Sequence, residues 1–266
     1  FYNPAGLVNL KSENKKSFLI GSTQLYQLDF LEHQYLSFGL SNGMAITYQQ
    51  LGTSHKGSSF LNSGEYSQYG FYNMGGFLSK EKSFSLSQGF SLIKDANSEF
   101  SMGYTLNYLS IFQNKSAGPY GNGENGLPSK NISSYTLDIG IYSAIRGKVA
   151  FGAYAKNISN ATISRGSASI HLPRRLDLGI TYIPSDDLLA TFELERVLGY
   201  DESSFRFGME YKVSDSFLVR SGIQINPNRL GAGFSYKFRK IEISYSLLTH
   251  PVLSISDVFN LKIYFD

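Results

Sequence analysis

Residues 205–212 read Phe-Arg-Phe-Gly-Met-Glu-Tyr-Lys, and this short stretch decides the fold. Large apolar side chains alternate with polar or small ones, and residues 217–224 (Phe-Leu-Val-Arg-Ser-Gly-Ile-Gln) and 230–238 (Leu-Gly-Ala-Gly-Phe-Ser-Tyr-Lys-Phe) repeat the pattern. Side chains point to opposite faces along a β-strand, so a period of two predicts half-buried strands. Because many such segments follow one another in 174–265 with short turns, we expect a meander that closes into a barrel.

The composition excludes several classes of protein. The chain has 266 residues without a break in composition, which indicates one large domain, and only 17% of them are charged. Its net charge of +3 does not point to a nucleic-acid partner. With no cysteine there are no disulfides or thiolate metal sites, and the four histidines lack ligand spacing. We therefore expect no metal site and no cofactor.

The direction of the apolar face separates a membrane barrel from a soluble β-sandwich, which would bury that face in a core. Glycine recurs on the polar face, at Gly208, Gly222 and Gly231 for example, where a water-exposed sheet would favour lysine or glutamate. The segments are about 9–11 residues long, which suits a tilted strand that crosses a bilayer. Tyrosine and phenylalanine gather near the strand ends, as aromatic girdles require. The pattern favours an antiparallel transmembrane β-barrel.

The strand count is expected to be fourteen, with twelve to sixteen allowed. Fifteen segments alternate, and bacterial single-chain barrels have an even number of strands. The first segment, 17–24, is the least regular and the best candidate for removal. We expect 1–16 to lead into a barrel over 17–266, with short turns in the periplasm and long loops outside. The long stretch 52–66 conflicts with this alternation. The fifteen segments are 17–24, 33–40, 43–51, 67–79, 82–93, 98–112, 132–144, 148–157, 174–183, 187–196, 203–212, 216–225, 229–238, 241–249 and 256–265.

The charged residues of the second half fall almost entirely on the polar face. Opposite charges often sit on neighbouring strands, which suggests ion pairs that link the lumen wall, because charges removed from water need partners. The expected pairs are Asp138 with Lys156, Arg220 with Glu210, and Glu242 with both Lys237 and Lys262. Exposure to water in an open channel is the alternative. For Glu193 and Glu195 we favour ion pairs over acid–base chemistry. The predicted network comprises Asp138, Lys156, Arg175, Asp177, Glu193, Glu195, Arg206, Glu210, Arg220, Lys237, Glu242 and Lys262.

On the polar face of the first half, residues 83–91 and 101–107 carry side chains that are small and nearly uncharged. This leaves room for a plug, a ligand or charged side chains from across the lumen. A candidate for the plug or gate is the segment Asn3, Pro4, Ala5 and Gly6; the alternative is a proline-fixed turn that leads into the first strand.

The segment Phe1-Tyr2-Asn3-Pro4-Ala5-Gly6-Leu7 resembles the N-terminal signature of the FadL superfamily of outer-membrane barrels, especially its PorV/PorQ-like branch. Five further segments also resemble sequences of that branch: residues 155–159, 176–182, 205–222, 231–234 and 241–265. The resemblance implies a fourteen-stranded barrel in the bacterial outer membrane. FadL is a transporter of hydrophobic compounds, whereas PorV and PorQ are protein-binding subunits of the type IX secretion and surface-attachment system of Bacteroidota.

The short chain and the absence of long hydrophobic loops depart from FadL. We therefore expect a non-enzymatic accessory subunit that anchors partner proteins in a secretion, attachment or assembly complex. Its partners would be outer-membrane lipid and other outer-membrane, periplasmic or surface proteins. The alternative function is FadL-like transport of small hydrophobic compounds or lipids. No nucleophile–base arrangement suggests an enzyme.

Overall fold

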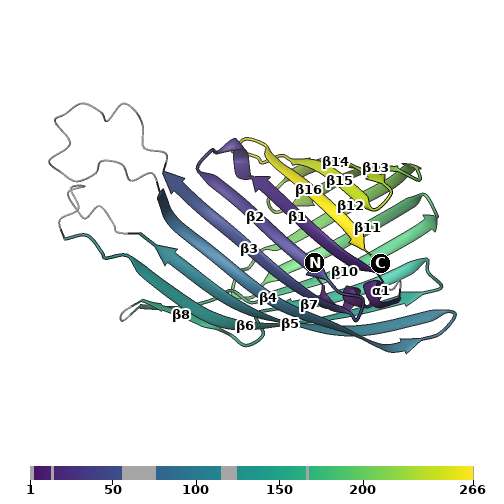
Figure 1. Cartoon of the computed structure of the whole chain (residues 1–266), viewed down its shortest axis with the longest axis horizontal. Helices are drawn as coiled ribbons and strands as arrows, with labels where there is room; N and C mark the ends of the chain where they lie inside the picture. The colour runs from purple at the N-terminus through teal and green to yellow at the C-terminus, as the bar shows by residue number, and fades with distance from the viewer. Residues whose placement is uncertain (1–2, 13–14, 56–75, 115–124, 166–167, 266) are drawn as a thin grey trace.

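The computed structural model describes residues 3–12, 15–55, 76–114, 125–165 and 168–265 (Figure 1). Almost all of them lie in β-strands. Two short helical turns, η1 and α1, precede the first strand, and a third, η2, follows it. The elements are η1 (Pro4–Leu7), α1 (Val8–Ser12), β1 (Lys16–Gln24), η2 (Leu25–Gln27), β2 (Leu31–Gly39), β3 (Met44–His55), β4 (Gly76–Lys94), β5 (Ser98–Gln113), β6 (Lys130–Ile145), β7 (Val149–Lys156), β8 (Thr162–Arg165), β9 (Ala168–His171), β10 (Arg175–Ser185), β11 (Leu188–Val197), β12 (Ser203–Ser214), β13 (Phe217–Ile225), β14 (Arg229–Phe238), β15 (Ile241–Leu248) and β16 (Ser256–Phe265).

Within the described residues, fourteen strands form a closed antiparallel barrel, as the sequence predicts. Each strand pairs with its neighbour in the chain except where β7 pairs with β10, because β8 and β9 form a separate hairpin between them. The barrel closes where β1 meets β16, from Lys16 opposite Phe265 to Gln24 opposite Asp257. Closure satisfies the backbone hydrogen bonds of every strand, which a bilayer requires.

The surplus strand of the sequence prediction was wrongly located. The first segment is a real strand, β1. The segments 67–79 and 82–93 were counted as two strands, but residues 76–94 form the single 19-residue strand β4, and 67–75 lie outside the described residues. With one strand there instead of two, the end of β3 and the start of β4 lie at the same end of the barrel as the end of β5 and the start of β6. Residues 52–55 belong to β3 and 56–66 lie outside the described residues, and the alternation no longer assigns this stretch to the periplasmic side.

The interior of the barrel is polar and its outer surface is apolar. Among the described residues, the buried hydrophobic side chains are those of Ala5, Leu7, Val8 and Ala45, whereas the buried polar set is much larger and includes Ser101 and Asp138. Phe207 and Phe234 are 43% and 42% exposed. A soluble β-sandwich would show the reverse, so that alternative is wrong. Apolar side chains on the outside are stable only in lipid, and the chain is a bacterial outer-membrane protein.

The two ends of the barrel differ. Tight turns such as 146–148 and 239–240 lie at the end that holds the start of β1 and the end of β16, and the longer connections lie at the other. By the usual asymmetry of these barrels, the short-turn end faces the periplasm. The wall is also uneven, because β4 to β6 have 16–19 residues while β7 and β15 have 8. In the described residues, no helix has the length and apolar character needed to span a membrane.

Candidate functional site

The N-terminal segment lies inside the barrel, against the walls of β4, β5 and β6 near the periplasmic end (Figure 1). Ala5 and Leu7 are fully buried and Val8 is 3% exposed. Pro4 occupies the first position of η1, where its missing N–H is not needed. The lumen around this segment is polar. Among the described residues, the segment and Ala45 together form the buried apolar core.

A row of glycines makes room for this segment. Gly89, Gly103 and Gly140 are direct register neighbours on β4, β5 and β6, and all face the lumen. A Cβ atom added at Gly103 would lie 2.5 Å from the Pro4 carbonyl carbon, and one at Gly89 would lie 2.9 Å from the Pro4 oxygen. At Gly140 it would overlap the side chain of Asn3. The absence of a side chain at Gly89 and Gly103 therefore allows backbone-to-backbone contact, and at Gly140 it leaves room for the side chain of Asn3.

Asn3 fastens the segment to the wall. Its side-chain Nδ2 donates to the carbonyl oxygens of Ile141 on β6 (2.8 Å) and Ala153 on β7 (3.2 Å). Its Oδ1 accepts from the backbone N–H of Ala5 at 3.0 Å and so caps η1. Gly6 donates its N–H to the Asn3 carbonyl at 3.1 Å. The four residues singled out from the sequence thus form one compact unit inside the lumen.

On the opposite side of the same wall lies an apolar cavity of about 370 Å³. It is open to the outer surface, where Phe151, Ile180 and Phe192 are exposed side chains. Gly152 and Gly179, which are register partners on β7 and β10, leave only backbone at its floor. The complete lining is Phe100, Ile141, Tyr142, Ser143, Phe151, Gly152, Ala153, Leu178, Gly179, Ile180, Phe192 and Leu194.

The inner segment and the outer cavity therefore meet at the same residues. Ile141 and Ala153 line the cavity, and their carbonyl oxygens accept the hydrogen bonds of Asn3. A Cβ atom on Gly152 would lie 3.6 Å from Asn3 Nδ2. At this point a single layer of backbone separates the lumen from the apolar exterior.

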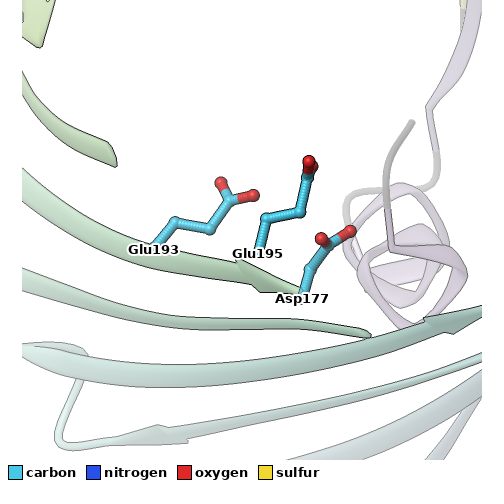
Figure 2. A group of neighbouring side chains, drawn as sticks. All are labelled: Asp177, Glu193 and Glu195. Atoms are coloured by element: carbon cyan, nitrogen blue, oxygen red, sulfur yellow. The ribbon is translucent and has the colours of Figure 1, made fainter. Parts of the chain in front are cut away.

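A second cluster of side chains faces the lumen from β10, β11 and β12. Asp177, Glu193 and Glu195 point into the interior (Figure 2), and their ligand oxygens lie within 4.8 Å of one another. Three carboxylates at this spacing resemble a metal site, but two guanidinium groups already bind them. Arg206 contacts Glu193 at 2.6 Å and Glu195 at 2.7 Å, and Arg175 contacts Asp177 at 2.9 Å and Glu195 at 3.3 Å. The arrangement is an ion-paired wall.

Two further parts of the predicted network lie elsewhere on the wall. Arg220 donates to Glu210 at 2.6 Å and to the Ser235 hydroxyl at 2.5 Å. Near the periplasmic end, Glu242 lies between Lys237 and Lys262 in register. Its carboxylate accepts from the Tyr264 hydroxyl at 2.9 Å, and the two ammonium groups lie 5.3 and 4.6 Å from the centre of the Tyr264 ring.

The pairing of Asp138 with Lys156 was wrong. Lys156 is exposed and lies opposite Arg175 in register. Asp138 is 2% exposed and accepts instead from Asn107 Nδ2 (2.9 Å), the Tyr154 hydroxyl (2.8 Å) and the backbone N–H of Asn157 (2.7 Å). Three donors, rather than one ammonium group, satisfy this buried carboxylate.

A ladder of polar side chains, which was not predicted from the sequence, surrounds Asp138. Asn107 joins Ser85 and Thr136 by hydrogen bonds of 2.6 and 3.0 Å, and Ser87 pairs with Thr105 at 2.9 Å. The alternating serine, threonine and asparagine residues of 83–91 and 101–107 were interpreted as small side chains that leave space. The hydroxyl and amide groups of these residues on neighbouring strands can pair by hydrogen bonds, and this was the sequence signal for the ladder.

Comparisons with known proteins give the class of barrel. No family model and no curated protein matches the sequence. Among solved structures, the toluene transporter TbuX of Ralstonia pickettii is similar over 99% of this chain and 92% of its own, with a TM-score of 0.57 and 15% identity. The toluene transporter TodX of Pseudomonas putida is similar over 98% and 90% (TM-score 0.55, 13% identity), and a FadL homologue of Pseudomonas aeruginosa over 100% and 93% (TM-score 0.54, 13% identity).

At these identities the likeness shows the fold, which is that of the FadL-type outer-membrane barrels. TbuX and TodX are toluene transporters. They fit the transport alternative better than the anchoring function expected from the sequence. Nothing in the comparisons supports the PorV/PorQ-like branch, a type IX secretion role or an origin in Bacteroidota.

Proposed function

We propose that this protein is an outer-membrane conduit for small apolar molecules. The observation that carries the proposal is the shared contact at Ile141 and Ala153, which the Asn3 segment touches from inside and the apolar cavity touches from outside. A volume of about 370 Å³ lies within the usual range of small-molecule pockets. The likeness of the fold to toluene transporters supports the same class of substrate.

The polar lumen determines the route in this proposal. An apolar molecule gains little from a wall of ion pairs and hydroxyl ladders, since burial of apolar surface is what stabilises it. It would instead cross between lumen and membrane at the glycine-thinned wall of β6, β7 and β10. Asn3 covers β6 and β7 of that wall from within, and the segment from Asn3 to Leu7, which lies against β4, β5 and β6, acts as the gate.

The test must include the outer membrane, which is the barrier that such a protein would help its substrate to cross. Toluene crosses a simple phospholipid bilayer unaided, so uptake is measured in Gram-negative cells that lack other FadL-type barrels, with and without this protein. The proposal predicts faster uptake of labelled toluene with the protein, and no change for a labelled sugar of similar size.

Equal toluene uptake with and without the protein would overturn the proposal. If uptake is unchanged and partner proteins are recovered in stoichiometric amounts in mild detergent, the anchoring function would be favoured over transport.

A further inference from the structure

An aromatic row crosses the outer surface of four neighbouring strands. Tyr48 on β3, Phe84 on β4, Tyr108 on β5 and Tyr135 on β6 are successive register partners. The rings of Tyr108 and Tyr135 lie 5.2 Å apart, and Tyr135 is 74% exposed. Tyrosine gathers where an apolar band meets the lipid headgroups.

The position of the row along the strands agrees with such a boundary. On β5 the outward side chains from Phe100 to Tyr108 are all apolar or aromatic. Eight residue steps of ~3.4 Å on a strand tilted by ~40° rise about 20 Å, close to the ~25 Å apolar band of these barrels. The row therefore marks the edge of the band on the side of the long loops, which is the outer leaflet.

Two lysines lie immediately beyond this row on the same outer face. From Phe84 toward the long-loop end of β4, Lys82 is the next outward-facing residue and Lys80 is the one after it. In register, Lys82 lies between Gln50 and Ser110. Lys82 is exposed.

The register neighbours of Lys80 are Gly52 and Phe112. In the lumen, unlike the surroundings of Lys82, Arg206 and Arg220 each bind a carboxylate on the adjacent strand. On this outer face, the neighbouring strands offer Lys82 an amide and a hydroxyl.

We propose that Lys82, together with Lys80, binds a phosphate group of an outer-leaflet lipid. Two ammonium groups two residues apart on one face, just past an aromatic boundary, match the position and charge of an anionic headgroup. Lysine stems lie along apolar surface while their ammonium groups reach the headgroup layer. Each such lysine contributes about 1 kcal/mol to attraction of an anionic membrane surface.

The test measures lipid binding to the purified full chain in detergent by native mass spectrometry. The probes are diphosphorylated lipid A, the same lipid without its phosphates, and inorganic phosphate alone. The variant Lys80→Gln/Lys82→Gln is compared with Lys148→Gln/Lys240→Gln, which removes the same charge from exposed turns at the periplasmic end. Heat-dependent gel migration confirms that both variants form the folded barrel.

The proposal predicts that the phosphorylated lipid binds the wild-type chain and the turn variant alike. The Lys80/Lys82 variant should bind it about thirtyfold more weakly. It further predicts weak binding of the dephosphorylated lipid and of free phosphate. Wild-type affinity in the Lys80/Lys82 variant would overturn the proposal, as would equal binding of the dephosphorylated lipid. Free phosphate that binds as tightly as the lipid would also overturn it, since the site would then select the anion alone.

Discussion

Asn3 and Ile141 are 138 positions apart in the chain, yet the side-chain amide of Asn3 donates a hydrogen bond of 2.8 Å to the carbonyl oxygen of Ile141. The contact joins the N-terminal segment to the wall of the barrel beside Gly152. It also places the cap of η1 directly behind an apolar cavity that opens to the membrane.

Replacing Asn3 by alanine should release the N-terminal segment. The change removes two hydrogen bonds to the wall and the cap on Ala5, and each lost bond costs about 0.5–1.5 kcal/mol. Hydrogen exchange at the backbone N–H groups of Gly6 and Val8 should become faster. The control Asn9→Ala removes an exposed amide of the same segment. Exchange that stays slow in Asn3→Ala would show that other contacts hold the segment.

Adding a methyl group to the glycine row should also displace the segment. A Cβ at Gly103 would lie 2.5 Å from Pro4 and 2.6 Å from the Ala5 nitrogen, so Gly103→Ala should destabilise the docked state by about 1–3 kcal/mol. At Gly179 the nearest atom to an added Cβ is 3.7 Å away, which makes Gly179→Ala the matched control. Faster exchange at Gly6 and Val8 in the first variant alone is the expected result; equal behaviour of the two would contradict it.

Asp138 should be essential for the stability of the barrel wall. Asparagine has one acceptor oxygen where the carboxylate serves three donors, so Asp138→Asn leaves at least one buried donor without its acceptor. The expected loss is about 1–3 kcal/mol, seen as a lower midpoint in heat-dependent gel migration. Asp186→Asn, in an exposed turn, makes the same chemical change as a control. A midpoint for Asp138→Asn that matches this control would show that the network tolerates the amide.

The pairing of Arg206 with Glu195 can be measured by a double-mutant cycle. Their side chains are 31% and 15% exposed, so the coupling should exceed the ~0.5 kcal/mol typical of exposed pairs. The variants are Arg206→Gln, Glu195→Gln and their combination, and the double variant should be more stable than the sum of the single losses predicts. Strict additivity would mean that solvent screens this pair.

The fold could be predicted from the sequence because its signal is local. The alternation of Phe205 to Lys212 follows from strand geometry alone, and closure removes exposed strand edges. The error over 67–79 and 82–93 lies at Lys80 and Glu81, which were placed between two strands. β4 continues through both residues beyond the apolar band.

The candidate site was only partly predictable, because its contacts join distant parts of the chain. The segment Asn3-Pro4-Ala5-Gly6 stood out, but nothing in the sequence pairs Asn3 with Ile141 or aligns Gly89, Gly103 and Gly140 in one register row. The pairing of Glu210 with Arg220 followed from adjacent strands joined by a short turn. Asp138 failed the same reasoning, since its donors come from β5, β7 and a backbone N–H beyond β7.

The most direct test of the account fills the cavity from the membrane side. Ala153→Phe places a ring where Ala153 lines the cavity, while Ala155→Phe makes the same change two residues along the same strand, outside the lining. Labelled toluene uptake is measured in cells that produce each variant at equal level in the outer membrane. The account predicts that Ala153→Phe lowers uptake to that of cells without the protein and that Ala155→Phe leaves it at the wild-type rate. Wild-type uptake by Ala153→Phe would contradict it.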